Sequence, residues 1–230
     1  MRTQKLWDGT LSPDEFCIAA KALCEKWKHI DSTLPQWNWV PRKGRLNGAT
    51  CNVEGYLSLE NVYRTGPDED HVSELRLSEE EESTDSATLV LSPKQEKYGY
   101  NYHIVYSFSY RVPVLYFRGY QYDGQLLTFE EIQNDLPDSS TSLLKESKWT
   151  FMTQEEHPFL CCPWFTLHPC GTSDWMKLLF GGNQQLDCKL VHYLPAWLSV
   201  VSQAVGLRVP LSLYNGSSID SKLDGSSYQA

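Results

Sequence analysis

The chain has 230 residues, and its 41% hydrophobic content is enough for one well-filled core rather than for a disordered protein. Its formal charge is −9, and residues 67–86, with nine acids and one arginine, carry −8 of it. A nearly neutral body with an acidic segment repels phosphates, which argues against nucleic acid as a partner and favours a basic protein surface.

Neither membrane insertion nor export is expected. The most apolar stretch, residues 194–211, is interrupted by Ser, Gln and Arg, whereas a membrane span needs about 18–20 apolar residues. The first 16 residues lack the apolar segment of a secretory signal. Seven cysteines at irregular spacing do not predict a disulfide framework. These features favour a cytoplasmic protein with reduced thiols.

The N-terminal part predicts a helix followed by strands. Ser12 is placed to cap the helix, with Pro13 in its first turn and Glu15 reaching back to the cap. Apolar residues recur at helical spacing and would face a core: Phe16, Ala19, Ala20, Leu23, Trp27 and Ile30. Residues 36–41 and 50–63 alternate apolar and polar side chains, so both predict strands.

Residues 66–97 predict an acidic mobile insertion. They are rich in Glu, Ser, Asp and Pro and poor in aromatic residues, so they bury too little apolar surface to offset their ordering entropy. The tail over residues 214–230 has no apolar period and is expected to be disordered. Apart from the insertion, residues 1–213 are expected to form a single domain.

Residues 98–128 carry the strongest strand pattern. One face of the first strand would hold Tyr100, Tyr102, Ile104, Tyr106, Phe108 and Tyr110. Pro113 would end or bulge the pairing, a second strand would cover 114–122, and Asp123-Gly124 predicts a turn. A capping box of Thr128 with Glu131 predicts a short helix, and Pro195 and Gly206 bracket another. The order of elements predicts an α+β fold with an antiparallel meander between N- and C-terminal helices.

Cys170 differs from the other cysteines because a helix is expected directly after it, with Thr172 or Ser173 as N-cap. Backbone amides at a helix start favour negative charge on a nearby thiol. Pro169 restricts His168 to an extended conformation. These residues leave two interpretations of Cys170 open, a nucleophile and a buried thiol. A metal site with Cys161 and Cys162 is disfavoured, because adjacent cysteines without a Cys-x-x-Cys pair are poor zinc ligands. No metal and no cofactor are expected.

Several motifs in order resemble the autophagy branch of the ubiquitin-conjugating-like enzymes. They are HPC at 168–170, EHPFL at 156–160, the aromatic hairpin at 106–128 and the apolar segment at 193–212. The resemblance covers roughly residues 98–213 and implies a ubiquitin-conjugating-enzyme-like core.

The resemblance also implies the chemistry and the partners. An activating enzyme, autophagy-related protein seven, would present a ubiquitin-like modifier, autophagy-related protein twelve, as a thioester, and Cys170 would take it over. A lysine of the acceptor, autophagy-related protein five, would then attack that thioester. The segment before Ser12 is short and polar, unlike the membrane-binding helix of the lipid-conjugating members, so a protein acceptor is expected.

Such a site has to orient the amine and stabilise an oxyanion. Ordinary ubiquitin-conjugating enzymes use an Asn shortly before the cysteine, but no Asn lies between Asn134 and Cys170. The resemblance points instead to Tyr110 and His157 as supporting catalytic residues, and His168 is expected to shape the loop. If the hairpin's outer strand is an edge, the acceptor could pair with it at Val114 and Tyr116.

Two other functions remain open at this level. A cysteine hydrolase acting on ubiquitin-like conjugates would use Cys170 with His157, although such enzymes usually place the cysteine before the histidine and only His192 follows Cys170. A non-catalytic adaptor of the same fold is the other alternative.

Overall fold

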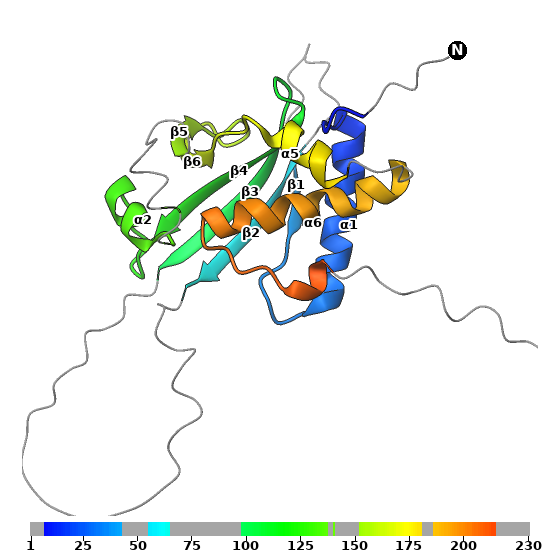
Figure 1. The fold of residues 1–230 in the computed structure, drawn as a ribbon. Helices are drawn as coiled ribbons and strands as arrows, with labels where there is room; N and C mark the ends of the chain where they lie inside the picture. The colour runs from blue at the N-terminus through cyan, green and yellow to red at the C-terminus, as the bar shows by residue number, and fades with distance from the viewer. Residues whose placement is uncertain are drawn as a thin grey trace, which may run out of the picture.

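The computed structural model describes residues 7–42, 55–64, 98–137, 140, 152–180 and 186–214. The predicted mobile insertion, residues 66–97, and the predicted tail apart from Tyr214 lie outside these residues. In chain order the elements are α1 (Pro13–Ile30), β1 (Asn38–Pro41), β2 (Gly55–Tyr63), β3 (Gly99–Ser107), β4 (Val112–Tyr120), α2 (Phe129–Asp135), β5 (Met152–Glu156), β6 (Pro163–Leu167), α5 (Thr172–Leu179), α6 (Leu186–Ala204) and a 3-10 helix (Leu211–Leu213) (Figure 1).

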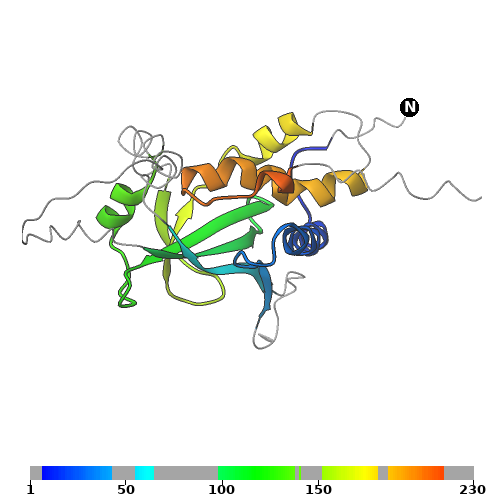
Figure 2. The ribbon, with the colours of Figure 1, turned by 90° about the horizontal axis from the view of Figure 1, so that it is seen from below.

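The strands form one antiparallel sheet of six in the order β1-β2-β3-β4-β6-β5. Helices α1 and α6 lie on the same side of this sheet, as Figures 1 and 2 show together. The main core fills the space between these helices and the sheet. The predicted α+β class and antiparallel meander are thereby confirmed. Among the described helices, none combines the length and apolarity that crossing a membrane requires.

Local signals place several element ends where the sequence predicts them. The Ser12 hydroxyl accepts from the Glu15 amide and the Glu15 carboxylate accepts from the Ser12 amide, which confirms the first capping box. Thr128 and Glu131 form the second one at α2. The chain turns at Gly124 and Gly206 with φ of 85° and 62°, left-handed values that glycine adopts without strain.

The alternation along β3 divides the sheet into two faces. Tyr100, Tyr102, Ile104 and Tyr106 point into the main core, as predicted. His103 and Val105 lie on the opposite face, in a second small cluster of Tyr56, Val105, Val114, Tyr116 and Trp164. The prediction is wrong at its end, because β3 stops at Ser107. Phe108 and Tyr110 lie in the turn to β4, and each is about half exposed, at 48% and 47%.

Two further predictions are corrected. β4 begins at Val112 and contains Pro113, which pairs with Tyr106 instead of ending the ladder. α6 begins at Leu186, well before Pro195, which lies inside the helix. Each proline lacks an amide hydrogen and so removes one backbone donor, but the strand and the helix both continue through it. The strands β5 and β6 were not predicted as strands.

Candidate active site

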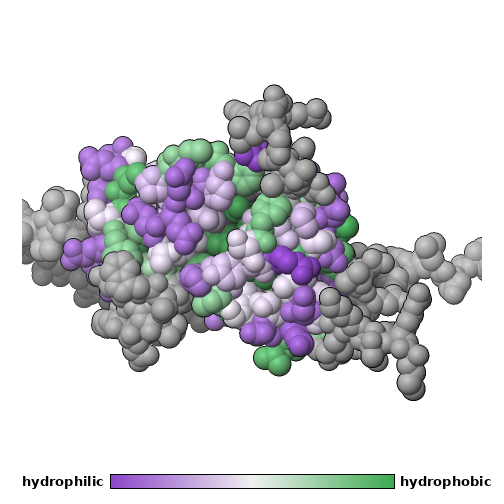
Figure 3. Space-filling view, turned by 90° about the horizontal axis from the view of Figure 1, so that it is seen from above, coloured by the Kyte–Doolittle hydropathy of each residue, from purple (hydrophilic) through white to green (hydrophobic). Residues whose placement is uncertain are grey.

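An open groove of about 460 Å³ lies on the face of the sheet opposite to α1 and α6. Its walls come from the β3–β4 turn (residues 108–111), from β4 and from the β5–β6 turn (residues 157–162). It reaches His168 and Pro169, the two residues that precede Cys170. Seen from the end of the molecule that carries α5 and the β3–β4 turn, the surface mixes polar and apolar side chains (Figure 3).

Cys170 is exposed, on the link between β6 and α5. Its backbone amide donates to Nδ1 of His168 over 3.1 Å. The next residue, Gly171, has φ of 76° and is the N-cap of α5, without any side-chain cap. The expectation of Thr172 or Ser173 as N-cap is therefore wrong, because the glycine turns the chain one residue earlier. The sequence left two interpretations of Cys170 open, a nucleophile and a buried thiol. The exposure of Cys170 excludes the buried thiol.

The structure brings Tyr110 close to this link. The Tyr110 ring lies edge-on to the His168 ring, with the centroids 5.8 Å apart at 78°. Ser107 fixes the turn that carries Tyr110, since its hydroxyl accepts from the Tyr110 amide and its carbonyl from the Arg111 amide. Contacts thus run from Tyr110 through His168 to Cys170. Because Nδ1 of His168 accepts from a backbone amide, His168 shapes the loop, as expected.

His157 has a different setting, fully buried under the groove. Its Nδ1 accepts from the amides of Phe159 and Leu160, so its proton is on Nε2, which donates to Nδ1 of His103 over 3.0 Å. Burial, with a smaller contribution from the Arg118 charge, lowers the pKa of His157 to about 4. Both ring nitrogens are engaged, and none of the described contacts joins His157 to Cys170.

The pKa of His103 is lowered to about 3, mainly by burial and to a smaller extent by the neighbouring His157 and Arg118. Both rings are therefore neutral at pH 7. His157 also holds the β5–β6 turn through its main chain, because its carbonyl accepts from the amides of Leu160 and Cys161. The pair fixes the turn whose Phe159 lines the groove.

Val114 and Tyr116 both line the groove and are each 6% exposed. The premise that their strand is a sheet edge is wrong, because β4 lies between β3 and β6 and Tyr116 pairs with Thr166. The physical reason is that β6 returns alongside β4 after a long connection that the sequence pattern did not reveal. A contact of these side chains with an acceptor stays a prediction.

Within the described ranges, no group of three or more His, Cys, Asp or Glu side chains is arranged to hold a metal ion. His103 and Phe159 also belong to this site, although the sequence pattern did not point to them. The signal for His103 was its position on the polar face of a strand, but only the packing of the β5–β6 turn shows that this face is covered.

Comparisons with known proteins agree on one family. A family model described as autophagocytosis associated protein, active-site domain, matches residues 15–212. The chain is 46% identical to the ubiquitin-like-conjugating enzyme ATG10 of Arabidopsis thaliana over 217 residues, covering 90% of this chain and 96% of that protein. It is 33% identical to human ATG10 over 204 residues, with coverages of 85% and 90%.

Similarity to autophagy-related protein 3 is lower. The Saccharomyces cerevisiae protein (strain ATCC 204508 / S288c) is 28% identical over 228 residues, covering 76% of this chain and 71% of that protein. The family model spans most of the chain, and two ATG10 enzymes exceed 30% identity over most of their length. The chain therefore belongs to the family of autophagocytosis-associated active-site domains, the ATG10 and ATG3 family of ubiquitin-like-conjugating enzymes.

Proposed function

We propose that Cys170 carries autophagy-related protein twelve as a thioester, received from autophagy-related protein seven, and passes it to a lysine of autophagy-related protein five. The observation that carries the proposal is an exposed cysteine beside an open groove in a member of this family. The reaction needs a reduced thiol, in keeping with the expected cytoplasmic location.

The two steps are acyl transfers. In the first, the Cys170 sulfur attacks the thioester carbonyl on the activating enzyme, whose sulfur leaves with the electron pair and takes up the proton that the Cys170 thiol releases. In the second, the lysine nitrogen attacks the carbonyl on Cys170. The Cys170 sulfur leaves, and the amine proton passes to it through solvent. Because the thioester is already activated, positioning and oxyanion stabilisation are the contributions left to the protein.

Tyr110 is proposed to help the second step through its hydroxyl, which would donate a hydrogen bond to the oxyanion or accept one from the incoming amine. Its half-exposed position on the turn next to His168 supports this role. Tyr110→Phe should then slow transfer to the acceptor by about 100- to 1,000-fold, the range found for the loss of a single oxyanion donor. Loading of Cys170 should change little.

His157 is proposed to act through position rather than by proton transfer, since both of its nitrogens are engaged. The same observation argues against the hydrolase alternative, which needs a histidine free to take the cysteine proton. Val114 and Tyr116 are proposed to meet the acceptor through their side chains in the groove, rather than through strand pairing.

A loading assay tests the function. The protein is incubated with the activating enzyme, the modifier and ATP, and is run on a gel with and without reductant. We expect a reductant-labile adduct, which Cys170→Ser converts into a reductant-stable ester. Cys161→Ser is the matched control, because Cys161 is also exposed, and it should keep the labile adduct. Absence of any adduct on the unchanged protein would favour the adaptor, and cleavage of a preformed conjugate would favour the hydrolase.

A further inference from the structure

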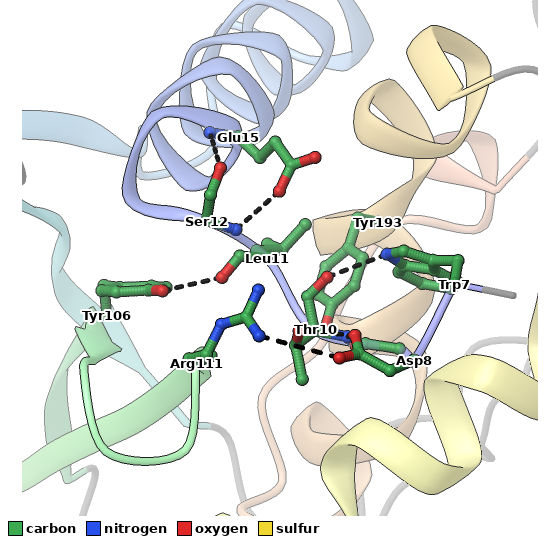
Figure 4. A network of polar contacts seen from close by, with 10 residues as sticks. Trp7, Asp8, Thr10, Leu11, Ser12, Glu15, Tyr106, Arg111 and Tyr193 are labelled. Atoms are coloured by element: carbon green, nitrogen blue, oxygen red, sulfur yellow. Dashed lines mark hydrogen bonds and ion pairs between the residues drawn. The ribbon is translucent and has the colours of Figure 1, made fainter. Parts of the chain in front are cut away.

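The segment before α1, residues 7–12, lies against both sides of the candidate site, and it is called the strap below (Figure 4). Its first group of contacts is with β3 and the β3–β4 turn. The Leu11 amide donates to the Arg111 carbonyl over 2.9 Å, and the Leu11 carbonyl accepts from the Tyr106 hydroxyl over 2.7 Å. Leu11 is fully buried, so its two backbone groups depend on these partners.

The strap is also shaped by Asp8. One oxygen of the Asp8 carboxylate accepts from the amide and hydroxyl of Thr10, and the other lies 3.7 Å from the Arg111 guanidinium. The Thr10 hydroxyl lowers the pKa of Asp8, with further help from the Thr10 amide and the Arg111 charge. The ion pair is more than half exposed and contributes little, so the backbone bonds of Leu11 provide the main attachment to the turn.

The second group of contacts is with α5 and α6. Gly9 adopts φ of 84° and packs so closely on α5 that a Cβ there would overlap the Ser173 carbonyl. Its own carbonyl accepts from the Tyr193 hydroxyl of α6 over 2.8 Å. Trp7 lies edge-on to Phe180 and to Tyr193, with centroids 6.0 Å away in both cases. The strap is therefore fixed to the helix that starts just after Cys170.

We propose that the strap positions the site, with Gly9 and Tyr106 as positioning residues for the acyl transfer. It holds the turn that carries Tyr110 at one end and the first turn of α5 at the other, so it sets the separation of Tyr110 and Cys170. This inference rests on the proposed function, because it assigns the strap a role in that reaction. Small displacements between reacting groups cost large factors in rate.

Gly9→Ala is the main test, and Gly124→Ala is its matched control. Both glycines have nearly the same left-handed backbone, with φ of 84° and 85°, but only Gly9 has atoms within 4 Å of the added Cβ. The two variants share the backbone strain and differ in the contact with α5. Tyr106→Phe removes the hydroxyl bond to Leu11 and serves as a second, milder variant. Its control is Tyr102→Phe on the same strand, which removes a hydroxyl bond to the Val205 carbonyl after α6.

The first measurement is hydrogen exchange on the free protein, which does not depend on any activity. Exchange of the amides in residues 108–111 and in the first turn of α5 should rise in Gly9→Ala and not in Gly124→Ala. Unchanged exchange in both segments would overturn the inference that the strap holds them in place, whatever the chemistry of Cys170. Loss of the adduct in the gel assay would refute the proposed function while leaving this result intact.

The second measurement is the discharge of preformed thioester to free lysine. Gly9→Ala should slow it by about tenfold or more, and Tyr106→Phe should slow it less, whereas both controls keep the original rate. Tyr110→Phe should then cost a smaller factor in the Gly9→Ala background than alone, since coupled residues are not additive. Three outcomes would each overturn the proposal. Tyr110→Phe could reduce the rate by the same factor in both backgrounds, or it could have no effect. Gly9→Ala and Gly124→Ala could also discharge the thioester at equal rates.

Discussion

Acidification should destabilise this protein through its buried histidine pair. His103 and His157 are 2% and 0% exposed, and they lie in a cluster with Tyr56, Tyr116 and Trp164. Burial lowers the pKa of His103 to about 3 and of His157 to about 4. In the unfolded chain both have the ordinary value of about 6.5. Below pH 6.5 the unfolded state therefore binds more protons than the folded state, and stability falls as the pH falls.

The size of the effect follows from these pKa values. Between pH 7 and pH 5 each histidine takes up most of a proton in the unfolded chain but stays almost unprotonated in the folded protein. This difference lowers the free energy of unfolding by about 2 kcal/mol per residue. The pair together should lower the free energy of unfolding by ~3–4 kcal/mol over this range, a large part of the ordinary stability of about 5–15 kcal/mol.

Urea unfolding at pH 7, 6 and 5 measures this loss. The control variant is His103→Phe, which keeps a ring stacked on Trp164 but removes one titrating group. It also leaves Nε2 of His157 without its acceptor, at a cost of about 1–3 kcal/mol that is the same at every pH. Its loss between pH 7 and pH 5 should be roughly half that of the original protein. A flat profile for the original protein, or the same slope in both, would refute the reasoning.

Three other changes test the packing that supports the site. Ser12→Ala removes the capping hydroxyl of α1 and should lower the free energy of unfolding by about 1 kcal/mol in urea titration; no change would show that the cap is dispensable. Arg64→Met removes the buried guanidinium that binds the Asp135 carboxylate over 2.7 Å and lies over the Tyr100 ring, and should cost about 2–4 kcal/mol; a gain in stability would contradict this. Trp197→Ala empties a fully packed position on α6 and should cost ~3–5 kcal/mol by calorimetry, whereas a loss below about 1 kcal/mol would mean that the core collapses into the gap.

Short-range patterns in the sequence were enough for several elements. The cap of α1 and its apolar face, the capping box of α2 and the aromatic face of β3 all depend on residues within a few positions of one another. Side-chain to backbone hydrogen bonds at helix ends and the alternation along a strand are local, so the sequence predicts them before any packing is known. Cys170 in its HPC motif was likewise singled out from neighbouring residues, but only the structure shows that its thiol is exposed.

Long-range packing decided the rest. His103 and His157 are 54 positions apart, and no local pattern indicates that they share a hydrogen bond. The place of β4 inside the sheet depends on the return of β6, and the start of α6 depends on packing that overrides the local effect of Pro195. The sequence by itself determined which residues could begin helices and line a core, and it singled out Cys170 as the proposed thioester residue. Only the tertiary structure decided which of them meet, because contacts between distant segments form only when burial of the whole core outweighs the entropy of closing the chain.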